Sequence, residues 1–231
     1  MSRFARIADG RERWSGGSRL PRHHHDQAYA AVVLAGFYEE CGSRGRFRVG
    51  AGDVLIHGCF ESHLDRFGTS GATILNLVIR NAGPLPCCIG SLRDADTIAR
   101  AAESDGAIAW SLLCEQVIPI ASTPADWPDM LARDLLRSPQ LNLGDWARDH
   151  RLAVETLSRG FHKIFGITPA EFRLEARARK ALARIIDGTE PLAAVAVAAG
   201  FADQAHMSRA TKSLTGETPG RLRAGQIGSR R

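Results

Sequence analysis

Three histidines in the N-terminal half, His23, His25 and His63, have the type and spacing that suit metal chemistry. Neutral imidazoles are good ligands for zinc, nickel, iron or copper. These residues are therefore candidate ligands of a divalent transition metal, the one cofactor that the sequence indicates. Cys41 and Cys59 join the candidates only if the fold brings them close. The structural alternative is that the first two histidines lie in an exposed loop and the third is hydrogen-bonded in the core.

Other patterns of catalytic residues are missing from the sequence. It shows neither a Ser/His/Asp pattern nor a phosphate-binding loop, and we expect no enzymatic activity. The five cysteines lack C-x-x-C spacing, so we expect reduced thiols, with Cys87-Cys88 as a redox-active alternative. The sequence has no apolar run of about eighteen residues and no apolar signal-peptide region, so we expect a cytoplasmic protein outside the membrane.

The C-terminal half contains an internal repeat. Leu157-Ser158-Arg159 returns fifty residues later as Met207-Ser208-Arg209. The same offset relates Gly166 to Gly216 and Pro169 to Pro219, whereas Ala147 and Ala196 are one residue closer. Two copies of one small helical unit, differing by one residue in a turn, explain these spacings.

Positive charge is concentrated in the half that holds the repeat. Residues 139–231 carry 15 Lys and Arg against 9 Asp and Glu, whereas residues 1–138 carry 15 against 16. A basic half next to a nearly neutral half suggests that one part contacts a polyanion and the other has a different role.

The pattern of apolar residues predicts an α+β chain with a β half before a helical half. Short apolar runs at 30–35, 53–57 and 73–79, separated by glycine-bearing turns, predict a sandwich or barrel. Residues 92–102 and 107–117 favour helix, and prolines punctuate a connector at 118–128. We therefore expect an N-terminal domain at 1–90, a helical connector with a role in dimerisation at 91–128, and a third region at 129–231.

The repeat itself predicts five helices, at 143–150, 154–165, 169–187, 192–199 and 203–214. Asn142 and Thr168 suit N-caps, and Gly166 suits the residue after a helix. Val154, Leu157, Phe161, Ile164 and Phe165 recur at spacings of three and four, which predicts one apolar stripe. A short helix, a turn and a second helix with a polar face form a helix-turn-helix unit, so we place two such units at 143–166 and 191–216.

The stretches 200–209 and 216–219 resemble the AraC/XylS family of bacterial transcription regulators. The resemblance covers about residues 131–223 and implies that the second helix of each unit contacts DNA bases. By position these residues are Glu155, Ser158 and Arg159 in the first unit and Gln204, Ala205, His206 and Arg209 in the second. Lys163 and Lys212, near helix ends, are expected to contact phosphate.

Four positions depart from the family pattern. Thr211 and Thr215 stand where the family has aromatic residues, Leu222 where it has tyrosine, and Arg151 where the first turn has glycine. We therefore expect a lighter core in the second helix-turn-helix unit.

Residues 10–80 resemble the small cupin barrel that precedes this DNA-binding unit in many family members. The resemblance implies an N-terminal cupin-like β-barrel that binds an effector. Metal-bearing cupins use an H-x-H pair, a nearby Glu and a distant His, which correspond here to His23, His25 and His63. The Glu is missing, and Tyr29 or Gln27 occupies its approximate place.

The combined interpretation is a sequence-specific transcription regulator of the AraC type, which binds double-stranded DNA under the control of a small-molecule or metal effector. The resemblance is compatible with a homodimer and with contact to RNA polymerase. The alternative is a metal-dependent cupin enzyme with an accessory DNA-binding domain. A structural binder of DNA without sequence preference is a third class.

Overall fold

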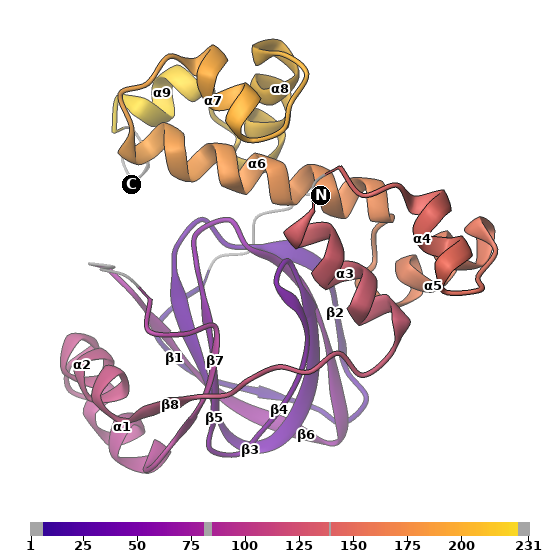
Figure 1. Ribbon diagram of the computed structural model, residues 1–231. Helices are drawn as coiled ribbons and strands as arrows, with labels where there is room; N and C mark the ends of the chain where they lie inside the picture. The colour runs from indigo at the N-terminus through magenta and orange to yellow at the C-terminus, as the bar shows by residue number, and fades with distance from the viewer. Residues whose placement is uncertain (1–6, 81–84, 139, 226–231) are drawn as a thin grey trace. The chain divides into compact units, whose positions relative to one another are not determined.

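The computed structural model describes residues 7–80, 85–138 and 140–225 and divides the chain into two compact units (Figure 1). The first unit covers Met1–Ala125 and the second covers Asp126–Arg231. An antiparallel sheet with two helices forms the first unit, and the second is helical. The predicted β half followed by a helical half is therefore confirmed. The division falls inside the proline-punctuated segment 118–128.

Eight strands form one antiparallel sheet in the first unit. They are β1 (Gly10–Trp14), β2 (Arg19–His24), β3 (Tyr29–Gly42), β4 (Gly45–Gly50), β5 (Asp53–His57), β6 (Ser62–Val78), β7 (Ile89–Leu92) and β8 (Val117–Pro119). The order is β1-β6-β3-β5-β7-β8, with β2 added to β6 and β4 added to β3. The apolar runs that predicted strands lie largely within β3, β5 and β6.

The two longest strands, β3 and β6, pair along almost their whole length, from Tyr29 opposite Val78 to Gly42 opposite His63. The pair bends at Gly36, whose φ is 75° and where a Cβ would lie 2.0 Å from a carbonyl oxygen of β6. On one side of this bend β3 also pairs with β5, and on the other with β4. Within the described residues the pairing forms an open path from β1 to β8, so a closed barrel is not established.

The two faces of the sheet bury different sets of side chains, because successive residues of a strand point to opposite faces. Ala30 and Val32 belong to a core cluster that includes Ile98 and Leu113 of the helices. The intervening Ala31, with Tyr29 and Val33, belongs to a second cluster that includes Phe67 and Ile74. The second cluster lines the inner face of the bent sheet, where the histidines lie.

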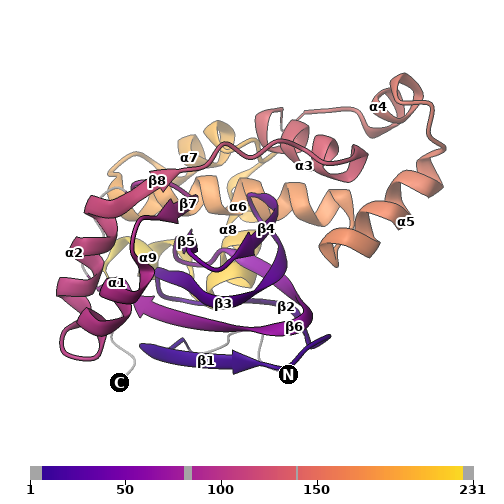
Figure 2. The same ribbon diagram turned by 90° about the horizontal axis from the view of Figure 1, so that it is seen from below.

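Most of the segment predicted as a helical connector, residues 91–125, is part of the first unit. Its helices α1 (Ala95–Ala102) and α2 (Gly106–Gln116) pack against each other and against β3 and β6, as Figure 2 shows. Strand β8 extends the sheet by pairing with β7. Ile98 and Ala99 of α1 and Ala109 and Leu113 of α2 are therefore part of the core, which the helical pattern alone could not indicate.

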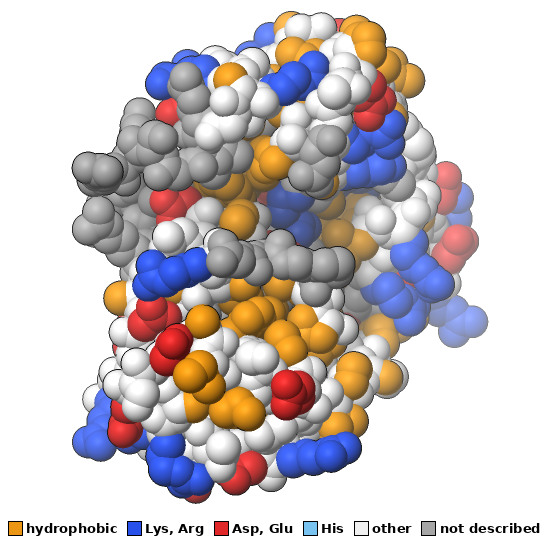
Figure 3. All heavy atoms as spheres, turned by 90° about the vertical axis from the view of Figure 1, so that its left-hand side faces the viewer, with side chains coloured by type: hydrophobic (Ala, Val, Ile, Leu, Met, Phe, Trp, Pro, Cys, Tyr) orange, Lys and Arg blue, Asp and Glu red, His pale blue; other side chains and the backbone are white. Residues whose placement is uncertain are grey.

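Some apolar side chains of this segment remain on the surface. Ile108 of α2 is 54% exposed and Ile118 of β8 is 50% exposed. Figure 3 shows hydrophobic side chains next to charged ones on the surface of the first unit. A role of this segment in dimerisation stays a prediction.

The second unit consists of seven helices within the described residues. They are α3 (Trp127–Arg137), α4 (Leu143–Asp149), α5 (Val154–Phe165), α6 (Pro169–Asp187), α7 (Leu192–Ala198), α8 (Gln204–Thr215) and α9 (Pro219–Arg223). The five helices predicted for the repeat are confirmed, each within one residue at either end. None of the helices in the described ranges combines the length and apolar character needed to cross a lipid bilayer.

An aromatic cluster joins α5 to the long helix α6. The rings of Phe161 and Phe165 stack with centroids 4.5 Å apart, and Phe172 meets both edge-on at 5.4 and 5.5 Å. All three side chains are fully buried. Val154, predicted for the same apolar stripe, is instead 47% exposed. It is the first residue of α5, and helical side chains tilt toward the N-terminus, so its side chain points beyond the helix end.

Replacing Phe161 by alanine is expected to destabilise the second unit by about 3–5 kcal/mol, because it removes a buried ring and leaves a cavity. Val154→Ala on the same helix is the matched control and should cost about 0.5 kcal/mol or less. Urea unfolding followed by the helical circular dichroism signal measures both values. Similar losses for the two variants would contradict the assigned packing.

Candidate functional site

The predicted DNA-contacting residues lie on the outer faces of α5 and α8. Residues Glu155, Arg159, Lys163, Gln204, Ala205, Arg209 and Lys212 are exposed, and Ser158 and His206 are partly buried. The opposite faces are buried, through Leu157 and Phe161 on α5 and through Met207 and Leu214 on α8. Each unit of the repeat therefore presents one polar helix face away from its own core. Contact of these residues with DNA stays a prediction.

The two helix-turn-helix turns are built by the same backbone hydrogen bond. In the first, the Leu152 N–H donates to the Ala147 carbonyl oxygen at 2.8 Å. In the second, the Phe201 N–H donates to the Ala196 carbonyl oxygen at 2.9 Å. Both alanines are buried, which lets the paired helices approach closely.

The left-handed residue of each turn differs between the units. Gly200 has a φ of 83° in the second turn, and Arg151 adopts a φ of 55° in the first. An L side chain is disfavoured in this region, so Arg151 takes the glycine conformation at a cost in backbone strain. The departure from the family pattern at this position therefore leaves the turn geometry intact.

The polar helices are capped unequally at their N-termini. The Asp203 carboxylate accepts the His206 N–H at 2.7 Å and caps α8. Ala153 occupies the equivalent position before α5 and provides no side-chain cap. Both helices end at a left-handed glycine, Gly166 and Gly216. Their starts therefore differ in stability although their ends are alike.

The second helix-turn-helix unit has the lighter core that the sequence predicts. Thr211 and Thr215 are buried at positions where an aromatic was expected. The Thr215 hydroxyl donates to the Thr211 carbonyl oxygen at 2.9 Å. The Thr211 hydroxyl oxygen has no hydrogen-bond partner among the described residues. A buried hydroxyl without a hydrogen-bond partner is destabilising, so we expect the second helix-turn-helix unit to be less stable than the first.

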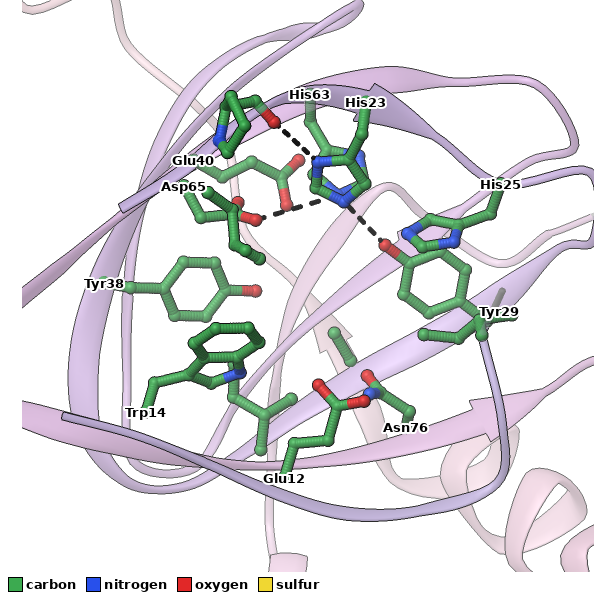
Figure 4. A pocket seen from close by; sticks show the side chains of 15 residues that line it. Glu12, Trp14, His23, His25, Tyr29, Tyr38, Glu40, His63, Asp65 and Asn76 are labelled. Atoms are coloured by element: carbon green, nitrogen blue, oxygen red, sulfur yellow. Dashed lines mark hydrogen bonds and ion pairs between the residues drawn. The ribbon is translucent and has the colours of Figure 1, made fainter. Parts of the chain in front are cut away.

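A second candidate site lies in the first unit, where a cavity of about 350 Å³ is partly open to solvent (Figure 4). The side chains labelled in the close view are Glu12, Trp14, His23, His25, Tyr29, Tyr38, Glu40, His63, Asp65 and Asn76. His23 and His63 lie with Glu40 and Asp65 at one end, Glu12 lies with Asn76 at the other, and Trp14 and Tyr38 line a wall. The cavity thus combines apolar walls with a polar end.

The three predicted metal ligands meet at the polar end of this cavity. His23 on β2 pairs in register with His63 on β6, and His25 directly follows β2. Their ligand atoms all lie within 4.8 Å of one another. His25 and His63 are buried and His23 is partly buried, so the exposed-loop interpretation is wrong. Binding of a metal by these residues stays a prediction.

The other candidates are placed differently. Cys41 Sγ accepts a hydrogen bond from Arg66, Cys59 is exposed, and neither cysteine joins a metal-ligand cluster in the described residues. Gln27 is exposed. The Tyr29 hydroxyl, in contrast, lies 3.3 Å from His63 Nε2. Tyr29 therefore contacts a predicted ligand, and Gln27 does not line the cavity.

Sequence reasoning missed two residues next to these histidines. Glu40, near the far end of β3, and His57, at the end of β5, form a second cluster with His63, again with ligand atoms within 4.8 Å of one another. Glu40 of β3 could therefore supply the carboxylate that metal-bearing cupins have and that the histidine motif of this chain lacks. No motif spacing marks Glu40, and only the β3–β6 register, which pairs it with Asp65, brings it to the histidines.

Burial sets the protonation of this cluster. Burial, with smaller contributions from neighbouring positive groups, lowers the pKa of His57 to about 3 and that of His63 well below its ordinary value. Burial also raises the pKa of Asp65 to about 8, and burial together with the charge of Asp65 raises that of Glu40 well above its ordinary value. Near neutral pH both imidazoles are therefore uncharged, which is the form that binds metals.

Comparison with known proteins matches the family model "Helix-turn-helix domain" to residues 146–225. The predicted helix-turn-helix domain is confirmed for this region. A search of curated proteins found no match.

Three solved structures are similar to this chain. The C-terminal domain of AraT, a response regulator from Geobacillus stearothermophilus, is 21% identical, with 45% of this chain and 88% of that chain covered and a TM-score of 0.40. The DNA-binding domain of AdpA, in complex with a target DNA, is 18% identical, with 46% and 97% covered and a TM-score of 0.41. ToxT from Vibrio cholerae O395 is 8% identical, with 97% and 98% covered and a TM-score of 0.41.

The unequal caps predict opposite effects of two substitutions fifty residues apart. Asp203→Ala removes a cap and is expected to cost about 1 kcal/mol of stability. Ala153→Asp supplies one, and the extended backbone of Ala153 is compatible with it, so stability should rise by about 0.5–1 kcal/mol. Urea unfolding of each variant measures the change. If both substitutions raised or both lowered the stability, the assignment of these two positions as N-caps would be contradicted.

Proposed function

We propose that this chain, whose residues 146–225 are an AraC-type helix-turn-helix domain, is a transcription regulator that reads two neighbouring major-groove segments of double-stranded DNA. The main observation behind this proposal is that α5 and α8, at corresponding positions in the two helix-turn-helix units, each expose a polar face. The 19-residue helix α6 between the units is about 28 Å long. Successive major grooves on one side of a duplex lie about 34 Å apart, a similar distance.

Specific base contacts are assigned to the outer side chains of α5 and α8. Arg159 and Arg209 can each donate two hydrogen bonds to guanine, Gln204 suits adenine and Glu155 can accept from cytosine. Ser158 and His206 are further polar contacts, and Ala205 offers a methyl group to thymine. Lys163 and Lys212 lie near the C-terminal ends of their helices and would contact phosphate.

The first unit is proposed to be a cupin-like sensor domain. Its cavity of about 350 Å³ is within the range of small-molecule sites, and apolar walls with a few polar groups are typical of such sites. An effector in this cavity would act by favouring one conformation of the chain over another. A small molecule or a divalent metal at the histidine end of the cavity is the proposed effector, and His23, His25 and His63 are the metal ligands that the sequence indicated. A homodimer and contact with RNA polymerase are further proposals.

The histidine cluster also supports one rival function, a metal-dependent enzyme with an accessory DNA-binding domain. Imidazoles at the end of a cavity could hold a metal with a position open to substrate. The rival predicts turnover of a small molecule that does not depend on DNA. The regulator predicts an effector that changes DNA affinity and is released unchanged.

Arg159→Ala and Arg209→Ala are each expected to weaken binding to a selected specific site by roughly 5- to 150-fold, the equivalent of about 1–3 kcal/mol. Binding to random DNA should change far less, because only the base contact is lost. Electrophoretic mobility shifts at constant salt measure both affinities. Arg93→Ala removes an exposed charge from the first unit as a control. Equal losses on specific and random DNA would assign these arginines to phosphate contacts.

Ala31→Leu is expected to remove the response of DNA affinity to an effector while leaving the affinity of the effector-free chain unchanged. Ala31 lines the cavity, so a larger side chain reduces its volume. Candidate effectors are titrated into a complex with the specific site, first with the natural chain and then with the variant. An effector that acts equally on both would place its site elsewhere.

A further inference from the structure

Three strands bring one carboxyl group and two imidazoles together behind the cavity. Glu40 comes from β3, His57 from β5 and His63 from β6. Their ligand atoms all lie within 4.8 Å of one another, and His57 Nε2 is 3.4 Å from Glu40 Oε2. Neighbouring ligand atoms on one tetrahedral or octahedral transition-metal ion lie about 3.0–3.4 Å apart, because each bond is about 2.1 Å long. The separation of His57 Nε2 from Glu40 Oε2 already matches this spacing, and movements of roughly 1 Å would bring His63 into a shared site.

Two buried nitrogen atoms of this cluster make no hydrogen bond among the described residues, although one of them lies 3.4 Å from the Glu40 carboxyl group. His57 and His63 are 5% and 3% exposed. His57 Nε2 and His63 Nδ1 form no hydrogen bond within the part of the chain that the structure describes. Buried polar atoms without such a bond are rare in folded proteins, and a bound ion can satisfy them. The Tyr29 ring stacks on His57 with centroids 4.5 Å apart and fixes its orientation.

We propose that Glu40, His57 and His63 hold a divalent transition-metal ion at the inner end of the cavity. Two imidazoles and one carboxylate are a donor set that suits zinc or iron and leaves coordination positions for other ligands. Glu40 and His63 also line the cavity, so these positions face a molecule bound there. This proposal depends on the proposed function in one respect only, because it takes the cavity to be the site where the effector binds.

Charge favours this set over the three histidines that the sequence indicated. Three neutral imidazoles give a buried divalent ion no ligand charge, whereas Glu40 gives it one negative charge once the ion displaces the carboxyl proton. His63 belongs to both clusters, so one ion occupies one or the other. Arg44 lies beside His57 at the back of the cavity wall, but Glu61 accepts a hydrogen bond from its Nε at 2.6 Å and balances its charge.

Zinc titration of the untagged, chelator-treated chain tests the proposal by calorimetry. One equivalent of Zn²⁺ should bind to the natural chain and raise its thermal unfolding temperature. Glu40→Gln and His57→Asn should each weaken zinc binding by more than about 100-fold, because loss of a ligand exceeds the effect of losing its outer partner. His162→Asn, which changes an exposed histidine of the second unit, is the matched control and should bind zinc as the natural chain does.

Several results would overturn the proposal. One is that the natural chain binds no zinc. Another is that His23→Asn or His25→Asn abolishes binding while Glu40→Gln and His57→Asn retain it. A thiolate charge-transfer band after Co²⁺ loading would equally place the ion on cysteines.

Two further measurements keep the test decisive. Circular dichroism shows whether Glu40→Gln and His57→Asn fold, and if neither does, X-ray absorption of the zinc-loaded natural chain decides. Two imidazoles with a carboxylate are expected, and three imidazoles without one would refute the assignment. DNA affinity of the metal-free chain is measured separately, so the failure of this site is distinguishable from failure of the proposed regulator.

Discussion

Each strand or helix of this chain buries one face, and this constraint decides where its polar side chains can act. Along β3 the period of two sends Ala30 and Val32 toward α1 and α2, while Tyr29 and Ala31 face the inner side of the bent sheet. Along α5 and α8 the helical period buries one stripe and leaves the opposite face polar. The cavity and the proposed DNA-reading surfaces both follow from satisfying a core.

Local signals in the sequence predicted the second unit well. Gly166 and Thr168 mark the end of one helix and the start of the next, and the capping box of Thr168 with Glu171 is formed. These signals act between residues a few positions apart, so helix limits can be predicted from short windows. The duplicated pattern added the pairing of helices that no single window contains.

Long-range pairing explains what the sequence could not show in the first unit. Glu40 and His57 have no spacing that relates them to His63, and three different strands bring them together. The register of β3 with β6 depends on the bend at Gly36 and on shifts near it. The histidine motif was therefore sufficient to find the cavity but not to find the carboxyl group beside it. The same limit applies to segment 91–128, where the two helices could be predicted but the strand β8 is defined only by its partner β7.

The two helix-turn-helix units are alike in geometry and unequal in their interactions. The first has a phenylalanine cluster but an uncapped α5 and a strained Arg151, whereas the second has a capped α8 and buried threonines. The two helix-turn-helix units therefore have different local weaknesses.

The continuous helix α6 has a consequence for the DNA sequences that this chain can recognise. One base pair added between two recognition segments turns one segment by about 34° relative to the other. A single 19-residue helix without proline after its first residue offers no joint to follow that turn. The proposed function therefore implies a spacer of constant length between the two segments in every target site, even where the bases within it vary.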